Sequence, residues 1–342
     1  MYDVAIVGAT GAVGECLLEI LALRDFPVGN LYLLASEESV GKRLAFRDQQ
    51  LKVQALESFD FTNAQIAFFS AGSRISSVYV PKAAEAGCIS IDNTAYFRYN
   101  SDVPLVVPEV NPEAIAGYRS RMIIANPNCS TIQMMVALKP IYDAVGIERI
   151  NVATYQSVSG AGREAVEVLA RQTAQLLNGQ EATDDGQVFA RQIAFNVIPQ
   201  IDIFLENGYT KEEMKMVWET QKILGDPDIR VNPTAVRVPV FYGHSEAVHI
   251  ETREAISAEE AKRLLQNAPG IQLLADDAAF PTVVSDASGQ DPVYVGRVRQ
   301  DISHPFGLDV WIVADNVRKG AALNAVQIAE LLPRYWVSPL NF

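Results

Sequence analysis

The sequence predicts an α/β fold in which a Rossmann-type, doubly wound parallel sheet is followed by a second, α+β domain. The chain has 342 residues, more than one hydrophobic core usually accommodates. In the first third, short apolar segments alternate with helical ones, which is typical of a parallel sheet buried on both faces. Further along, longer segments alternate apolar and polar residues, as the strands of a mixed or antiparallel sheet do.

The elements of the parallel sheet are expected near the N-terminus. An apolar run at 4–7 ends in a glycine, and the segment after it carries leucines on one helical face. The same alternation then continues along the chain. The expected strands are 4–7, 31–35, 52–54, 65–69 and 88–91, and the expected helices are 15–23 and 79–86.

The second half of the chain predicts a sheet with helices on one face. Its strands are longer and alternate in polarity, and its helical segments are amphipathic. The expected strands are 149–158, 234–241 and 246–253, the expected helices are 163–177 and 211–224, and a final amphipathic helix is expected at 321–332.

Composition and charge exclude several classes of protein. The net charge of −13 at pH 7 disfavours nucleic acid as a partner. No apolar run approaches the roughly 20 residues that a membrane-spanning helix needs, and the first residues predict a strand instead of a signal peptide. Three cysteines without paired or zinc-like spacing argue against disulfides and against a metal site. We therefore expect a cytoplasmic protein that acts on a small molecule.

A glycine-rich loop follows the first expected strand and opens the first expected helix. It reads Gly8-Ala-Thr-Gly11-Ala-Val-Gly14. In this context the glycines permit a tight turn and close backbone approach, and the helix N-terminus receives a pyrophosphate. The loop therefore predicts a dinucleotide site, and a glycine-rich turn without a ligand is the alternative.

The residues after the second expected strand bear on the choice of cofactor. They read Ser36-Glu37-Glu38-Ser39. An acidic residue here usually accepts a hydrogen bond from the ribose 2′-hydroxyl and favours NAD over NADP. The alternatives are that both glutamates are solvated, or that Lys42 and Arg43 neutralise a 2′-phosphate.

One cysteine stands at the expected start of a helix. Cys129 lies in the segment Asn126-Pro-Asn-Cys-Ser-Thr131, which is followed by an apolar helical pattern. Asn128 is a good helix N-cap, and the positive end of the helix would stabilise a thiolate. A buried structural cysteine is the alternative, and it is our expectation for Cys16 and Cys88.

Four further segments carry polar side chains that fit one reaction. Arg237 and His244 are expected on one extended segment, where alternation would turn them to opposite faces unless the turn at 242–243 re-aims the histidine. Glu212 and Lys215 share a helix face at spacing i, i+3. The other two segments are Thr154–Gly162, with Gln156, and Asp92–Arg98.

With these motifs the sequence resembles the bacterial aspartate-β-semialdehyde dehydrogenases over essentially its whole length. The resemblance includes the glycine loop, the segment around Cys129, and Gly243-His-Ser-Glu246. It also includes 103–111 and Asp315-Asn-Val-Arg-Lys-Gly320. It implies reductive dephosphorylation of L-aspartyl 4-phosphate to aspartate semialdehyde with NADPH, in the biosynthesis of lysine, threonine, methionine and isoleucine.

The resemblance also implies a role for each site residue. Cys129 would be the nucleophile, His244 the general acid/base and Gln156 the group that orients the acyl carbon. Substrate would be bound by Arg98, Asn128, Gln156, Glu212, Lys215 and Arg237, with Asn93 close to the phosphate. The cofactor would be bound by Gly8, Thr10, Gly11, Ala12, Val13, Ser36, Glu38, Ser39, Ser159, Gly160 and Asn316.

The resemblance extends to domains and assembly. Residues 1–128 would be a dinucleotide-binding domain, and 129–318 a catalytic and dimerisation domain. Residues 319–342 would carry a helix that packs on the first domain, and the protein would be a homodimer. One departure is Glu38, where NADP-using relatives usually carry an arginine. NADP remains the expected cofactor, and Glu38 keeps NAD possible because a glutamate repels the 2′-phosphate.

Two rival functions remain at this point. N-acetyl-glutamyl-phosphate reductases use a similar cysteine and histidine, but their nucleophile segment differs from the one around Cys129. The family also has close paralogues that lack the cysteine and are not enzymes, and Phe26–Gly29 and 189–195 resemble that branch. Cys129, Gln156, Arg237 and His244 are all present here, which favours an active enzyme.

Overall fold

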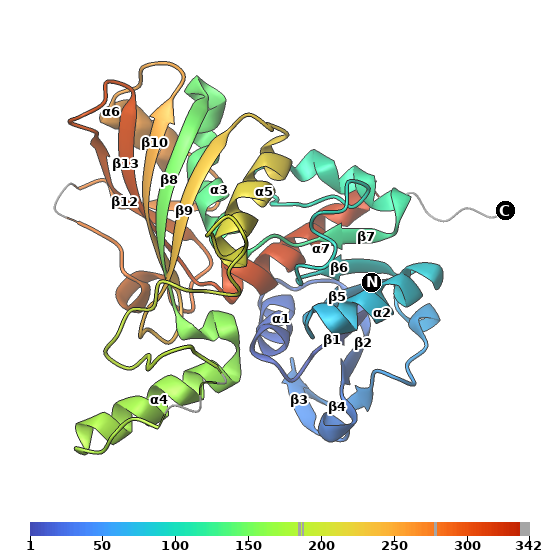
Figure 1. Cartoon of the computed structure of the whole chain (residues 1–342). Coiled ribbons are helices and arrows are strands. Elements are labelled where there is room, and N and C mark those ends of the chain that lie inside the picture. The colour runs from blue at the N-terminus through green and yellow to red at the C-terminus, as the bar shows by residue number, and fades with distance from the viewer. Residues whose placement is uncertain (184–185, 187, 277–278, 336–342) are drawn as a thin grey trace. The chain divides into compact units, whose positions relative to one another are not determined.

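The computed structural model describes residues 1–183, 186, 188–276 and 279–335. The chain forms two compact units (Figure 1). Unit 1 comprises Met1–Asn128 with Ala321–Phe342, and unit 2 comprises Cys129–Gly320.

Unit 1 is built on a seven-stranded sheet. Its pairs are parallel except for the edge pair β3–β4, and its central strands are buried on both faces. This confirms the expected parallel sheet. In spatial order the strands are β3 (Arg43–Phe46), β4 (Gln49–Ala55), β2 (Val28–Ala35), β1 (Tyr2–Val7), β5 (Ile66–Phe69), β6 (Ile89–Asp92) and β7 (Ile123–Ala125).

The helices of unit 1 come from both ends of the chain. α7 (Leu323–Tyr335) packs against α1 (Ala12–Leu23), and Arg24 donates two hydrogen bonds of 2.7 Å to Glu330. α2 spans Ser73–Glu85, so its predicted start at residue 79 was wrong. Its first turns lack an apolar stripe, which is the signal that the prediction used. Short 3₁₀ segments are η1 (Glu37–Ser39), η2 (Phe61–Asn63) and η3 (Pro112–Ser120).

Unit 2 is built on a six-stranded mixed sheet, which confirms the predicted α+β class. β8–β9 and β11–β12 are parallel pairs, and the other pairs are antiparallel. In spatial order the strands are β11 (Ile271–Leu273), β12 (Val293–Gln300), β13 (Gly307–Ala314), β10 (His244–Thr252), β8 (Ile147–Gln156) and β9 (Arg230–Arg237).

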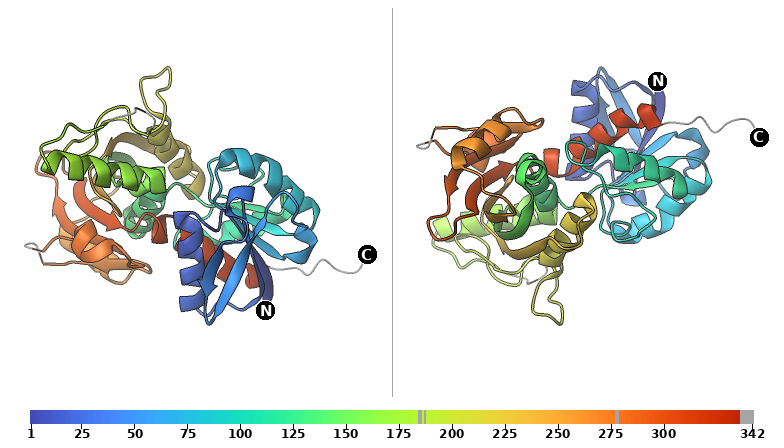
Figure 2. Two further views of the ribbon diagram at one scale, coloured as in Figure 1. Left: turned by 90° about the horizontal axis from the view of Figure 1, so that it is seen from below. Right: turned by 90° about the horizontal axis from the view of Figure 1, so that it is seen from above.

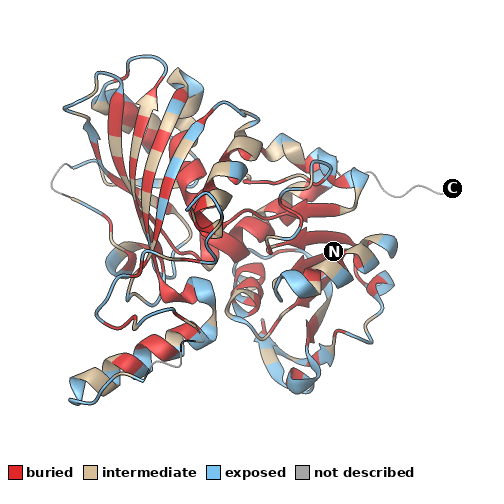
Figure 3. Ribbon diagram, in the orientation of Figure 1, coloured by how far each residue is buried: buried red, intermediate tan, exposed pale blue. Residues whose placement is uncertain are grey.

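Helices cover one face of the unit 2 sheet. α3 packs on β8, β10, β12 and β13, between α5 beside β9 and α6 beside β11 and β12. On β10 the residues of this face are buried and the alternate residues are half-buried (Figure 3). α4 projects from the end of the sheet (Figures 1 and 2). The helices are α3 (Cys129–Val145), α4 (Arg163–Leu177), α5 (Lys211–Leu224) and α6 (Ala258–Gln266), and shorter turns are η4 (Val158–Ala161), η5 (Val283–Ala287) and η6 (Arg318–Ala322).

Candidate active site

Three polar side chains meet because their strands share one register. Gln156 on β8 pairs with Arg237 on β9 and with His244 on β10. Residues directly opposite on neighbouring strands point to the same face, and all three are buried. The prediction that Arg237 and His244 lie on one extended segment was wrong. β9 ends at Arg237 and β10 begins at His244, so β8 lies between them in the sheet.

The thiol of Cys129 contacts this row of side chains. α3 begins at Cys129, as predicted, and the Cys129 Sγ lies 3.2 Å from His244 Nε2. Gly320 leaves room for the thiol, because a Cβ on Gly320 would lie 2.7 Å from the Cβ of Cys129. Cys129 is partly exposed, whereas Cys16 and Cys88 are buried, and burial raises the pKa of Cys88 to about 12. Cys129 is thus the thiol placed for chemistry.

The other ring nitrogen of His244 fixes the tautomer. The backbone N–H of Ser157 donates to His244 Nδ1 over 3.1 Å. Nδ1 is therefore the acceptor in the neutral ring, and the proton resides on Nε2, which faces Cys129. Burial, and then the charge of Arg237, lower the pKa of His244 to about 3. With its pKa lowered in this way, the imidazole is a neutral hydrogen-bond donor at cellular pH.

Asn316 accepts hydrogen bonds from two turns that flank the His244 ring, the turn at 157–160 after β8 and the turn at Gly243 before β10. Its Oδ1 accepts hydrogen bonds from Gly243 N at 2.9 Å, Ser159 Oγ at 3.1 Å and Ser157 Oγ at 3.2 Å. Gly243 has φ +85, and a Cβ there would lie 2.9 Å from Val283. Asn316 and Ser159 therefore support the position of His244 directly, and their expected contact with the cofactor stays a prediction.

A carboxylate and an amine extend the site along α5. Glu212 accepts from Gln156 Nε2 at 3.2 Å and from Lys215 Nζ at 2.8 Å. Lys215 also donates to Asp202 at 3.0 Å. Burial lowers the pKa of Lys215, but Glu212 and Asp202 together raise it above its usual value. Gln156 further donates to Ser130 Oγ at 2.9 Å.

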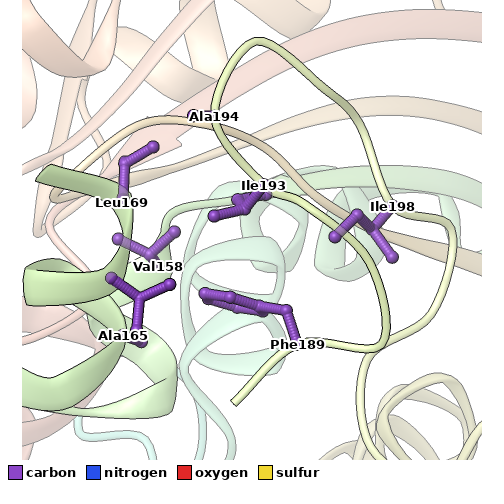
Figure 4. Close-up of a cluster of buried hydrophobic side chains, with 8 residues drawn as sticks. Val158, Ala165, Leu169, Phe189, Ile193, Ala194 and Ile198 are labelled. Atoms are coloured by element: carbon purple, nitrogen blue, oxygen red, sulfur yellow. The ribbon is translucent and has the colours of Figure 1, made fainter. Parts of the chain in front are cut away.

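Arg237 is fixed by backbone groups on both sides. Its Nη1 donates to the Ser157 carbonyl over 2.7 Å, and its backbone pairs with Ile198 at 2.8 and 2.9 Å. Ile198 belongs to a buried apolar cluster that joins 189–198 to α4 and to Val158 (Figure 4). Gly160 lies close against Arg237 and His244, since a Cβ there would lie 3.1 Å from Arg237 Nη1 and 3.4 Å from the His244 ring.

The glycine loop of unit 1 has the geometry of a dinucleotide site. Gly8 has φ +88, and a Cβ on Gly14 would lie 2.7 Å from the Cα of Ala9, so helix and strand pack closely there. The half-exposed residues Ala12 and Val13 begin α1, and Gly11 before them offers no side-chain cap. The N–H groups of the first helical turn thus point toward where a pyrophosphate would bind.

The expected ribose-binding residues differ in exposure. Ser36 and Glu38 are exposed, whereas Ser39 is buried. The Ser39 hydroxyl lies 3.5 Å from Thr10 Oγ1 and accepts a hydrogen bond from Lys42 Nζ over 3.3 Å. A lysine and two hydroxyls therefore gather beside the loop, and Glu38 is not among them.

The expected phosphate residues of unit 1 form their own network. Arg98 is buried, and its Nη2 donates to the Asn93 carbonyl over 2.9 Å. Asn93 Oδ1 accepts from Asn126, whose own Oδ1 accepts from Asn324 on α7. Asn128 is buried at the end of this unit. Cooperation of Arg98 with Lys215, which belongs to unit 2, stays a prediction.

Several residues of the site were not predicted. Ser157 and Asp202 were missed because they are distant in sequence from His244 and Lys215, which they contact only in the folded chain. Ser130 adjoins Cys129 in sequence, which is a signal that was available. Gln133 and Glu246 are buried beside the site.

Among the described residues no group of three or more His, Cys, Asp or Glu side chains is placed to hold a metal ion. Within the same residues no helix is long and apolar enough to cross a membrane.

Comparison with known families finds a matching family model for each of the two units. Residues 3–118 match the model of the semialdehyde dehydrogenase NAD binding domain, and residues 138–319 match that of the semialdehyde dehydrogenase dimerisation domain.

Individual relatives are similar over nearly the whole chain. Aspartate-semialdehyde dehydrogenase 2 of Vibrio cholerae is 65% identical over 97% of this chain and 98% of its own. Aspartate-semialdehyde dehydrogenase of Shewanella violacea is 62% identical over the same shares. Among solved structures, aspartate semialdehyde dehydrogenase II of Vibrio cholerae complexed with ASA superposes with a TM-score of 0.97. It is 64% identical, over 98% of this chain and 99% of that one.

Proposed function

This chain belongs to the aspartate-semialdehyde dehydrogenase family, and on that premise we propose that it converts L-aspartyl 4-phosphate to L-aspartate 4-semialdehyde with NADPH. The observation that carries the proposal is the 3.2 Å contact between Cys129 Sγ and His244 Nε2, next to the buried Arg237 and Glu212. The product serves the biosynthesis of lysine, threonine, methionine and isoleucine.

The reaction proceeds through a thioester on Cys129. The thiolate attacks the acyl carbon, the C–O bond to phosphate breaks, and phosphate leaves with its electron pair. Bound NADPH supplies a hydride to the thioester carbon. The tetrahedral alkoxide then collapses to the aldehyde and returns the electron pair to sulfur. The departing phosphate takes up one proton from water, so the reduction consumes one proton overall, and sulfur ends as the thiolate with which it began.

The role of His244 in the reaction follows from its tautomer. The Nε2–H donor stabilises the Cys129 thiolate before attack and the alkoxide after reduction. Since Nδ1 accepts the Ser157 N–H, the ring donates this hydrogen bond without becoming charged. His244 therefore acts as a neutral donor, and its low pKa is consistent with that part.

Charged side chains select the substrate. We assign the α-carboxylate to Arg237, whose planar fork suits a bidentate pair, and the α-amino group to Glu212. We assign phosphate binding to Lys215 in unit 2, and we assign Arg98 and Asn128 in unit 1 as further substrate-binding residues on the basis of the family resemblance. Gln156, held between Ser130 and Glu212, orients the acyl group.

NADP is the cofactor we assign. A solved relative, aspartate semialdehyde dehydrogenase of Candida albicans with NADP, has a TM-score of 0.77 and is 25% identical over 98% of this chain and 99% of that one. In this chain Lys42 and Ser39 supply a cation and a hydroxyl beside Thr10. These groups suit a 2′-phosphate, whereas the exposed Glu38 lies in solvent.

We also assign a homodimer in the cytoplasm. A dimerisation domain is matched by residues 138–319, and one face of the unit 2 sheet has no helix layer among the described residues. On that face the rings of Tyr155 and Trp311 lie 5.8 Å apart, centroid to centroid, in a tilted arrangement, and Tyr155 remains exposed.

The proposal is tested by the phosphate-dependent oxidation of aspartate semialdehyde, with NADP and NAD measured side by side. NADPH formation that requires phosphate is expected. Alkylation of one thiol per chain should abolish it, and substrate should protect that thiol. A chain without turnover toward either cofactor would instead support the non-enzymatic paralogue.

A further inference from the structure

A glutamic acid lies buried beneath the reactive pair and has no part in the reaction described above. Glu246 is fully buried on β10, two residues after His244 and therefore on the same face of the sheet. Its neighbour in register on β8 is Thr154, and on β13 it is Ile312. Glu246 thus lies in the next row of side chains, under α3.

Gln133 on α3 connects this row to the site. It lies one turn after Cys129 and is fully buried. Its Nε2 donates to the backbone carbonyl of His244 over 3.4 Å. This hydrogen bond links the helix that carries the thiol to the strand that carries the imidazole.

The polar atoms of Glu246 and Gln133 complement one another. Within the described part of the chain, both carboxyl oxygens of Glu246 and the Oε1 of Gln133 are buried and make no hydrogen bond of good geometry. Burial raises the pKa of Glu246 well above its usual value, and the adjacent Gln133 amide lowers it by less. A buried carboxyl that remains protonated offers a donor and an acceptor, and it suits a neutral amide beside it.

We propose that Glu246 is a positioning residue, a neutral carboxylic acid that fixes the Gln133 amide and through it the distance between Cys129 and His244. The inference rests on the proposed function of that pair. It does not give Glu246 contact with substrate, and its effect is on the reactivity of the thiol.

The test compares variants that separate hydrogen bonding from charge and volume. Glu246→Gln keeps a neutral group that both donates and accepts, whereas Glu246→Leu keeps volume and removes both functions. Val248→Ala, on the same face of β10, is the control for general loosening. The readouts are kcat, KM, and the rate of Cys129 alkylation by iodoacetamide across pH, located by peptide mass.

We expect Glu246→Leu to lower kcat and the alkylation rate by about 10²-fold with little change in KM, since a displacement of about 1 Å has that effect. Glu246→Gln should stay within about threefold of the original protein. Val248→Ala should lower thermal stability and leave the alkylation profile unchanged. Gln133→Met should match Glu246→Leu, and the double variant should be no worse than either.

Three outcomes would overturn the inference. The first is an equal loss of kcat in Glu246→Gln and Glu246→Leu. The second is an unchanged pH profile of Cys129 alkylation in Glu246→Leu. The third is the same altered alkylation profile in Val248→Ala. If Glu246→Leu does not fold, the comparison is made between Gln133→Met, which should slow alkylation of Cys129, and Glu246→Gln, which should not. Slow alkylation of Cys129 in the unaltered chain would instead contradict the proposed function. The contact between Glu246 and Gln133 would then be tested by thermal stability, which Glu246→Leu should lower and Glu246→Gln should not.

Discussion

The dinucleotide loop of unit 1 and the thiol site of unit 2 are built in opposite ways. The loop is a contiguous, half-exposed stretch in which glycines and backbone N–H groups form the expected binding surface. The thiol site gathers buried side chains from three strands and the start of a helix. Substitutions in the loop should therefore change affinity modestly, whereas substitutions in the thiol site should change the rate of chemistry.

The largest effect should come from the thiol. Cys129→Ser should lower turnover by on the order of 10⁴-fold or more, because a hydroxyl is far less ionised than a thiol. The measurement is kcat with intact cofactor binding as a check of folding. Cys16→Ser, the same change at a buried cysteine of unit 1, should retain activity. Retention of more than a small fraction of kcat by Cys129→Ser would refute the thioester.

His244→Asn should follow, with a loss in kcat of about 10²–10³-fold and little change in KM, as expected when one hydrogen-bond donor to the developing charge is displaced. His249→Asn, on the same strand but the other face, is the matched control. Because the pKa of His244 is lowered to about 3, kcat/KM should show no limb from this ring between about pH 5 and 8. A limb near neutrality that disappears only in His244→Asn would contradict the neutral donor.

Arg237→Lys should lower kcat/KM by about 10–10²-fold, since an ammonium cannot form the planar, two-bond fork. Lys215→Ala should instead raise the KM for phosphate in the oxidative direction. Steady-state kinetics with each substrate varied separates the two anion sites. If Arg237→Lys altered only the KM for phosphate, the two assignments would have to be exchanged.

The stability of the folded chain should also depend on His244. Its pKa in the folded chain lies near 3, below its unfolded value, so the unfolded chain binds more protons between about pH 3 and 6.5. Stability is therefore lost as pH falls through that range. Urea unfolding at pH 7 and pH 5 should show a smaller loss in His244→Asn than in the unaltered chain. Equal losses would mean that His244 is not buried as a neutral ring.

The smallest effects should be in cofactor choice, on the loop side of the comparison. Lys42→Ala should lower kcat/KM for NADP by about five- to tenfold and scarcely affect NAD. Glu38→Arg should improve NADP use by at most about fivefold, and less at high salt, because the side chain is exposed. Equal changes for both cofactors would exclude contact with the 2′-phosphate.

The same contrast explains what the sequence could predict. The loop is local, so strand, glycines and helix follow from neighbouring residues, and the bounds of α4 and α5 were predicted to the residue. The row of Arg237, Gln156 and His244 depends on strand register across distant segments, and the resemblance to a family supplied the residues without their arrangement. The tautomer of His244 depends on a backbone N–H of Ser157, which leaves no mark in a side-chain pattern. The strands β3, β7, β11, β12 and β13 and the helix α6 were not predicted.

The central claim is that Cys129 carries the acyl group, and it is tested most directly by omitting phosphate. Aspartate semialdehyde and NADP mixed rapidly with the protein should give a burst of about one NADPH per chain, after which turnover stops because the thioester has no acceptor. Peptide mass should then locate an aspartyl group on Cys129. The absence of a burst, or an adduct on another residue, would contradict the account.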